Sequence, residues 1–199
     1  KALYERGAVS LAARPITLFF LLEEFWERGS FPARRRELYE HGCERLCQEH
    51  DPSRIERLRA QGKVGTLPSS SQLIEVASRL AALLILGGKA SVYIGSDSST
   101  SEVDLGIGQC AGGTESNDGN AFTVTQDAVF CTLATALFSS RGEDIFGFAH
   151  QTFAECLAAR YLSKLPFKEI RRLTFQKERR SLYVPPQLAD TVAWLAGAR

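Results

Sequence analysis

The stretch that most constrains the fold changes from a strand pattern to a helix pattern within a few residues. The apolar run from Ile145 to Ala149 predicts a short β-strand, and the residues from Thr152 to Leu165 predict a helix. Within that helix Phe153, Leu157 and Tyr161 recur at i, i+4 and i+8, a spacing that places their side chains on one face. We therefore expect this helix to pack on a hydrophobic core.

One of the three histidines of the chain stands at this junction. His150 comes just before the predicted helix, where the first backbone N–H groups have no partner within the helix. Its imidazole would either cap the helix or bond the backbone there, or it would donate a hydrogen bond to a bound anion. The residues alone favour the structural role, and the anion-binding role stays open.

Residues 1–60 form the first of three segments that turn-forming residues separate, and we expect it to be a helical domain. A first helix starts at Pro15 and ends at the Gly-Ser-Phe-Pro stretch of residues 29–32. A second helix passes through Tyr39 and Cys47 and ends near Pro52.

Residues 66–165 form the second segment, which predicts a winged-helix domain. A Leu- and Ala-rich helix from Leu73 to Leu86 begins after serines that can cap it and ends at two glycines. A strand from Ala90 to Ile94, a helix from Gln126 to Phe138 and the strand and helix already described complete the order expected of a winged-helix variant. The polar residues from Gly95 to Asn120 predict a long loop.

Residues 166–199 form the third segment, which has a helical tendency broken by Pro185 and Pro186 and predicts the start of a C-terminal helical region. It is rich in Lys and Arg, and a solvated helix face explains this more simply than a phosphate-binding patch. The fold class predicted for the whole chain is mainly α with a small β component, a helical bundle plus a winged-helix domain.

Composition excludes several classes of partner. The formal charge is +1, so no global electrostatic field points to nucleic acid or an anionic membrane. The apolar run from Ile16 to Leu22 is too short to span a bilayer, and no secretory signal precedes it. The chain starts at Lys1 without any methionine, and we expect it to be a piece of a longer protein.

The five cysteines do not form a disulfide-like framework, which favours a reducing, cytoplasmic setting. Cys43, Cys47 and His50 fall on one helix face and would offer three ligands to zinc. A single helix leaves such a site incomplete, so core packing is the simpler interpretation of these cysteines. No metal site is predicted.

The sequence gives no sign of catalysis by this chain. Cys156 lies in the middle of a predicted helix with no base near it in sequence, and the serine-rich stretch of residues 96–101 lacks a nucleophile-elbow pattern. The Gly-Lys pairs at Lys63 and Lys89 lack the spacing of a phosphate-binding loop. The chain is therefore not expected to be an enzyme on its own.

A longer pattern around His150 resembles a known family. The segment FxFxHQTFxExLAARYL of residues 146–162 resembles the end of the winged-helix domain in bacterial NACHT-type STAND NTPases, which are multidomain ATP/ADP switches of signalling and antiviral defence. The residues around Pro15 resemble the start of the family's first helical domain. Residues 31–40 resemble its next helices, and residues 185–196 resemble the lead-in to its C-terminal repeats.

The resemblance implies two nucleotide contacts. It assigns to Pro15 the packing against the adenine, and to His150 the contact with the β-phosphate of ADP in the resting state. ADP or ATP would bind only together with a nucleotide-binding domain that this sequence does not contain. The implied partners are that domain and the C-terminal repeats of the same chain, with homo-oligomer formation on activation. The parent protein would be an ATPase.

Two other classes of protein remain as alternatives. A winged-helix DNA-binding regulator would need a basic recognition helix, yet residues 126–138 contain no Lys or Arg and one Asp, Asp127. A helical protein-interaction scaffold would need no ligand contact at His150. Binding to nucleic acid or to a membrane is not expected.

Overall fold

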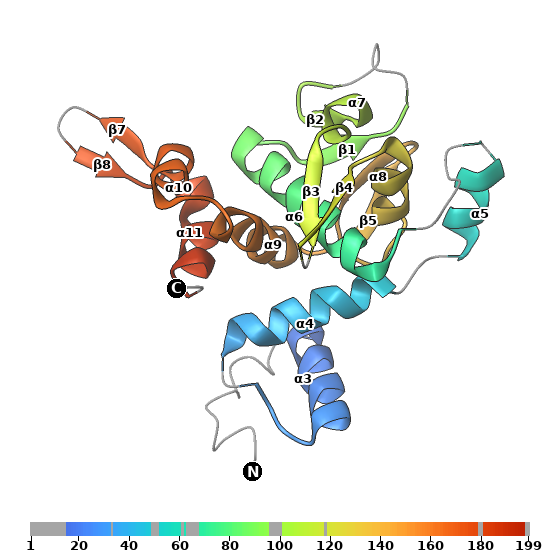
Figure 1. Cartoon of the computed structure of the whole chain (residues 1–199), viewed down its shortest axis with the longest axis horizontal. Helices are drawn as coiled ribbons and strands as arrows, with labels where there is room; N and C mark the ends of the chain where they lie inside the picture. Colours follow the sequence, from blue (N-terminus) through green and yellow to red (C-terminus); the bar gives the residue numbers. More distant parts are fainter. Residues whose placement is uncertain are drawn as a thin grey trace.

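A buried helix, α6 (Ser70–Gly87), forms the centre of the structure. The computed structural model describes residues 15–32, 34–48, 52–60, 62, 68–95, 101–117, 119–178 and 181–197 (Figure 1). Helix α6 starts where Ser69 accepts a hydrogen bond from the Gln72 N–H and the Gln72 side chain bonds back to the Ser69 N–H. It ends at Gly88, whose φ of 61° is the left-handed conformation that favours glycine. The predicted start and end of this helix are confirmed.

By length and composition α6 is also the one helix in the described part of the chain that would suffice to cross a membrane. More than half of it is buried inside the protein, against helices on several sides. A helix that is apolar on most of its faces is expected at the centre of a core. The burial of α6 therefore identifies it as a core helix.

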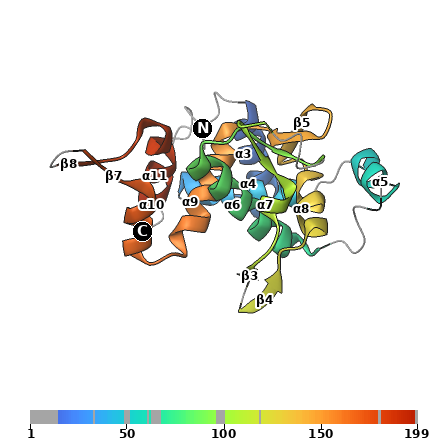
Figure 2. The same cartoon turned by 90° about the horizontal axis from the view of Figure 1, so that it is seen from above.

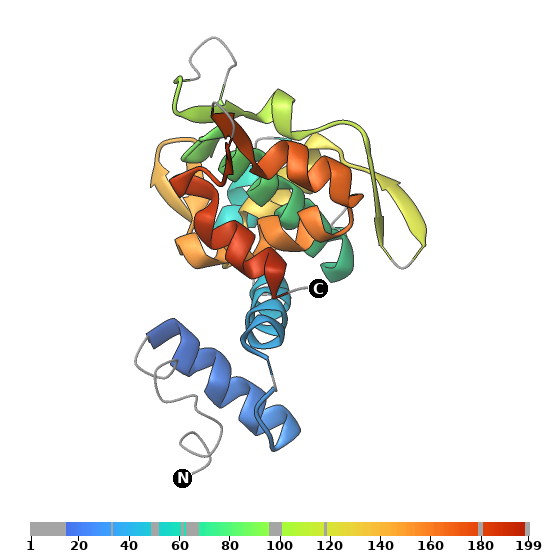
Figure 3. The ribbon, with the colours of Figure 1, turned by 90° about the vertical axis from the view of Figure 1, so that its left-hand side faces the viewer.

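The described residues of the first segment form α3 (Pro15–Arg28), α4 (Arg35–Gln48) and α5 (Pro52–Ala60). Gly29, with a φ of 66°, follows α3 as the sequence predicts. Figure 3 shows α4 between α3 and the rest of the molecule. Helix α4 ends at Gln48, shortly before Asp51 and Pro52, as the sequence predicts. The sequence did not predict α5, which begins at Pro52, a position that proline tolerates well.

A four-stranded sheet lies beside α6 (Figure 1). Its strands are β1 (Ser91–Tyr93), β2 (Asp104–Gly106), β5 (Phe138–Gly142) and β6 (Ile145–Phe148), in the order β2-β1-β6-β5. β1 pairs in parallel with β2, and the other two pairs are antiparallel. The predicted elements are present in the expected order as α6, β1, α8, β6 and α9, but β2, α7, β3, β4 and β5 lie between them.

The predicted long loop between Gly95 and Asn120 is wrong from Asp104 onward, where strands and a helix take up most of the residues. After β2 the chain forms a short helix, α7 (Ile107–Cys110), and a hairpin of β3 (Thr114–Asn117) and β4 (Asn120–Thr123). Figure 2 shows that this hairpin extends away from the sheet. Polar composition misled the prediction, since a two-stranded ribbon exposed on most of its surface needs few apolar residues.

The helix predicted over Gln126 to Phe138 is shorter than expected. Thr125 caps α8 (Gln126–Leu133) by accepting from the Ala128 N–H at 3.1 Å, as predicted. Ala134 ends the helix, and Phe138 begins β5 instead, where its ring packs on Phe148 of β6. Cross-strand aromatic packing has therefore outweighed a helical pattern.

The C-terminal elements are two helices, a second exposed hairpin, a 3-10 turn and a further helix. These elements are α9 (Gln151–Ser163), α10 (Phe167–Thr174), β7 (Gln176–Glu178), β8 (Ser181–Tyr183), the 3-10 turn η2 (Pro186–Leu188) and α11 (Ala189–Ala196). The sequence predicts only helical structure after Leu165. This prediction is wrong for the residues that form the β7–β8 hairpin. Taken together, the described residues confirm the predicted class of a mainly α protein with a small β component.

One hydrophobic core joins the first and second segments. Buried side chains of α3 and α4 belong to the same cluster as those of α6, α8, α9 and the sheet. A buried carboxylate, Glu75 of α6, adds a polar link to α9: Arg160 donates to it at 2.7 Å and Lys164 pairs with its other oxygen. Since a carboxylate is costly to bury alone, this pairing fixes how α6 and α9 face each other.

Gly42 sets how closely α3 approaches α4, and its replacement gives a prediction of definite sign. A Cβ atom at Gly42 would lie 2.6 Å from ring carbons of Phe20. In a free helix Gly→Ala stabilises by about 0.5–1 kcal/mol, but here Gly42→Ala should lower the free energy of unfolding by about 1–3 kcal/mol because Phe20 must move. Gly87→Ala is the matched control, since its Cβ would meet only Lys89 Cγ at 3.4 Å. Urea unfolding checks both, and a stabilised Gly42→Ala variant would contradict this packing.

Candidate functional site

His150 is the N-cap residue of α9, directly after strand β6. Its backbone is extended, with φ −141° and ψ 134°, and its Nδ1 accepts a hydrogen bond from the Thr152 N–H at 3.3 Å. In a neutral imidazole one nitrogen accepts and the other carries the hydrogen. Nε2 is therefore the donor, and no hydrogen bond from it to another described residue is present.

A series of ring contacts connects His150 to the first and third segments. The ring of His150 lies 5.6 Å from that of Phe153, and Phe153 lies 5.7 Å from Phe20 of α3. Phe20 meets Tyr39 of α4 edge to face at 5.8 Å, and Tyr39 lies 5.0 Å from Trp194 of α11. These separations are those of favourable aromatic pairs, so four helices meet around one aromatic cluster.

Pro15 is the first residue of α3 and is exposed. It is five positions before Phe20, whose ring contacts Phe153 of α9. The structure thus brings the helix that carries Pro15 against the helix that His150 caps. No contact between Pro15 and His150 themselves is present.

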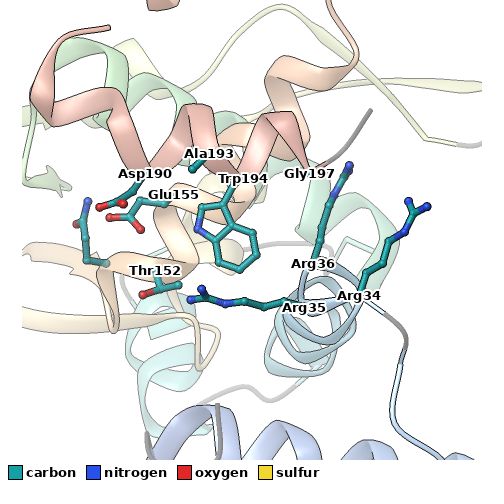
Figure 4. Close-up of a pocket in the computed structure, with 10 residues that line it drawn as sticks. Arg34, Arg35, Arg36, Thr152, Glu155, Asp190, Ala193, Trp194 and Gly197 are labelled. Atoms are coloured by element: carbon teal, nitrogen blue, oxygen red, sulfur yellow. The ribbon is translucent and has the colours of Figure 1, made fainter. Parts of the chain in front are cut away.

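A pocket near this cluster opens between α4, α9 and α11 and has a volume of about 730 Å³ (Figure 4). Its lining includes Gln151, the residue that follows His150 in the sequence. Neither His150 nor Pro15 is among its described lining residues. The wall from α4 is basic and the facing wall is acidic. The lining residues are Arg34, Arg35, Arg36, Gln151, Thr152, Glu155, Asp190, Ala193, Trp194 and Gly197.

Arg35 extends across this pocket toward Trp194 (Figure 4). Its guanidinium carbon lies 4.7 Å from the Trp194 ring centroid and 5.4 Å from that of Tyr39, which are cation–π distances. Burial, and then the charge of Asp190, raise the pKa of Glu155, while hydrogen bonds from Gln151 and Trp194 and the charge of Arg35 oppose this rise.

Guanidinium, carboxylate, amide and indole groups line the pocket, and groups of these kinds can hold a polar ligand in place. The sequence did not predict this pocket because its walls come from three distant segments. The run of three arginines, Arg34 to Arg36, was a visible signal that sequence reasoning passed over.

The metal interpretation gains no support within the described ranges, where no group of three or more His, Cys, Asp or Glu side chains is placed to hold an ion. Cys43 and Cys47 are buried, free thiols of the core, and His50 lies outside the described residues. Burial raises the pKa of both thiols strongly. Packing therefore accounts for these two cysteines.

Comparison with protein-family models, with curated proteins and with solved structures finds no match in any of the three.

The contact of Arg35 with Trp194 gives a prediction for the pocket. In a Trp26→Phe background, which leaves Trp194 as the remaining tryptophan, Arg35→Ala should shift the Trp194 fluorescence and lower stability by about 0.5–1 kcal/mol. Arg34→Ala is the matched control, because Arg34 lines the same pocket without a ring contact. Equal spectra for the two variants would contradict the stacked geometry.

Burial of the thiols gives a second prediction. Burial raises the pKa of Cys110 and Cys156 to about 12 and that of Cys131 to about 11. At about pH 8.5, the usual pKa of a free thiol, iodoacetamide should leave the folded chain almost unmodified and should label five cysteines in urea. Mass spectrometry counts the labels, and rapid labelling of Cys43 or Cys47 without denaturant would contradict their place in the core.

Proposed function

We propose that this chain is the regulatory part of an ATP/ADP-dependent switch of the NACHT/STAND type. In this role it helps to hold ADP in the resting state and rearranges for oligomerisation on activation. The chain itself supplies contacts rather than chemistry, and a nucleotide-binding domain elsewhere in the parent protein carries the ATPase activity. The setting proposed for it is the cytoplasm.

The observation that carries this proposal is the orientation of the His150 ring. Nδ1 is engaged as the acceptor for the first turn of α9, so Nε2 presents its hydrogen away from the helix. A donor at the start of a helix suits a phosphate, because the unpaired N–H groups and the helix dipole there also favour negative charge. The same bond also satisfies a purely capping role, and the experiment below separates the two.

The arrangement of the neighbouring elements supports the proposal. Helix α3 with Pro15 at its start packs on α9 through Phe20 and Phe153, so the two residues that the resemblance assigns to the nucleotide lie on helices in contact. A DNA reader is not favoured, since α8 has no Lys or Arg and its residues from Ala128 to Leu133 are buried. A recognition helix must expose its side chains to a groove.

Replacement of His150 by serine tests the proposal. In the parent protein His150→Ser keeps a cap, since the hydroxyl accepts from the same N–H group, but it is too short to place a donor where Nε2 lies. ADP should bind about tenfold to a hundredfold more weakly, which is the loss expected for one hydrogen bond to a charged group. The measurement is the ADP content after purification together with the rate of ADP release.

Two further variants separate binding from stability. His150→Ala removes the cap and the donor, so it should lose ADP as His150→Ser does and also lose about 1 kcal/mol of stability. Thr125→Ala removes a comparable cap, at α8, and should lose stability but keep ADP. If His150→Ser retains ADP like the unchanged protein, the histidine is only a cap. That result would contradict the proposed contact between His150 and the nucleotide.

A further inference from the structure

Two exposed surfaces on different parts of the molecule have complementary chemistry. The first is the outer side of α3, and the second is the projecting element made of α10 and the β7–β8 hairpin, called the arm below. In Figure 1 the arm extends to the left of the molecule, and α3 lies at the lower end of the molecule. Helices α4, α9 and α11 separate the two surfaces along the fold.

Helix α3 carries apolar residues on two sides. Phe20 and Leu21 are buried against the core, whereas a second set points to solvent, with Trp26 84% exposed. This second set defines the α3 face: Phe19, Leu22, Phe25 and Trp26. Large apolar side chains that gather on one exposed face usually mark an interaction site.

The α3 face has an acidic border. Glu23 and Glu27 follow one edge of the apolar residues, and Arg45 of α4 pairs with both. One guanidinium cannot neutralise two carboxylates, so this edge keeps a negative charge. The helix as a whole contains three Glu and one Arg.

The arm has the opposite charge. Residues 166–183 contain six Lys or Arg and two Glu, for a net charge of +4, while the other residues contain 18 Lys or Arg and 21 Asp or Glu, for a net charge of −3. Lys168 and Arg171 are exposed on α10, and Lys177 is exposed on β7. The positive charge of the chain is therefore concentrated in the arm.

The arm also exposes apolar groups, although Ile170 of α10 is buried in a small cluster with Ala159, Leu162 and Leu195. Phe167 is 62% exposed, and Leu182 and Tyr183 of β8 are exposed as well. All six residues of β7 and β8 are exposed, so both faces of the ribbon meet solvent. Because an isolated two-stranded ribbon is only marginally stable in water, a partner that covers one face would stabilise it.

We propose that the arm of one copy docks on the α3 face of a second copy of this chain. Leu182 and Phe167 would cover the apolar residues of the α3 face, and Lys177 with the arginines of α10 would meet its acidic edge. The two surfaces differ, so the contact is head to tail: it leaves a free arm at one end and a free α3 face at the other. This contact rests on the proposed function, because it names the surfaces through which the expected oligomers would form. The contact itself requires neither nucleotide nor His150.

Sedimentation of this chain over a wide concentration range tests the contact. The unchanged chain should associate beyond dimers, and high salt should weaken the association because charges contribute. Trp26→Lys, which blocks the α3 face, and Leu182→Glu, which blocks the arm, should each raise the dissociation constant about tenfold or more. Val103→Lys is the matched control, since Val103 is an exposed apolar residue outside both surfaces. Circular dichroism should show that all three variants fold.

A mixture of the two blocked variants gives the deciding result. Trp26→Lys keeps its arm and Leu182→Glu keeps its α3 face, so one native contact can form between them. The mixture should therefore give heterodimers that grow no further, while each variant alone stays monomeric. A monomeric unchanged chain, an association that ignores both substitutions, or a mixture without heterodimers would each overturn the proposal. So would a monomeric chain whose arm binds a single-stranded oligonucleotide, because the arm would then be a nucleic-acid surface.

Discussion

The burial of α6 is the constraint on which the other elements depend. This helix is apolar over most of its surface, so neighbours must cover it on several sides. Helix α9 covers one side, α8 and the sheet cover others, and α4 brings the first segment to the same core. Glu75 makes the arrangement specific. A rotation of α9 about α6 would move Arg160 away from Glu75 and leave a buried carboxylate unpaired.

The position of His150 is a consequence of this packing. Helix α9 is held by α6 along its length and by Phe20 near its start, and β6 delivers the chain to that start. The cap bond then orients the imidazole, so that Nε2 becomes the donor. A residue held by a core helix, a strand and a cap has little freedom, and such a fixed position suits the nucleotide contact proposed for His150.

The sequence predicted the elements whose signals are local. Caps at Ser69 and Thr125, the stop at Gly88 and the strand before His150 all lie where residue types specify them. The prediction failed where pairing with another segment determines the structure. The polar β3–β4 and β7–β8 ribbons show no alternation of apolar residues that would indicate a strand. Phe138 lies in a strand because Phe148 lies opposite to it. The pocket beside Arg35 and Trp194 was missed for the same reason, since its walls come from separate segments.

Helix α3 shows how one segment meets two requirements at once. Gly42 lets Phe20 reach the core, so one side of α3 is fixed on α4 and α9. Its other side leaves four large apolar residues partly or largely exposed, a cost that the described residues of one copy do not offset. If a partner covers that side, any movement of α3 also moves the Phe20–Phe153 contact behind His150. Helix α3 would then couple a partner on its exposed side to the position of His150, through one packed aromatic pair.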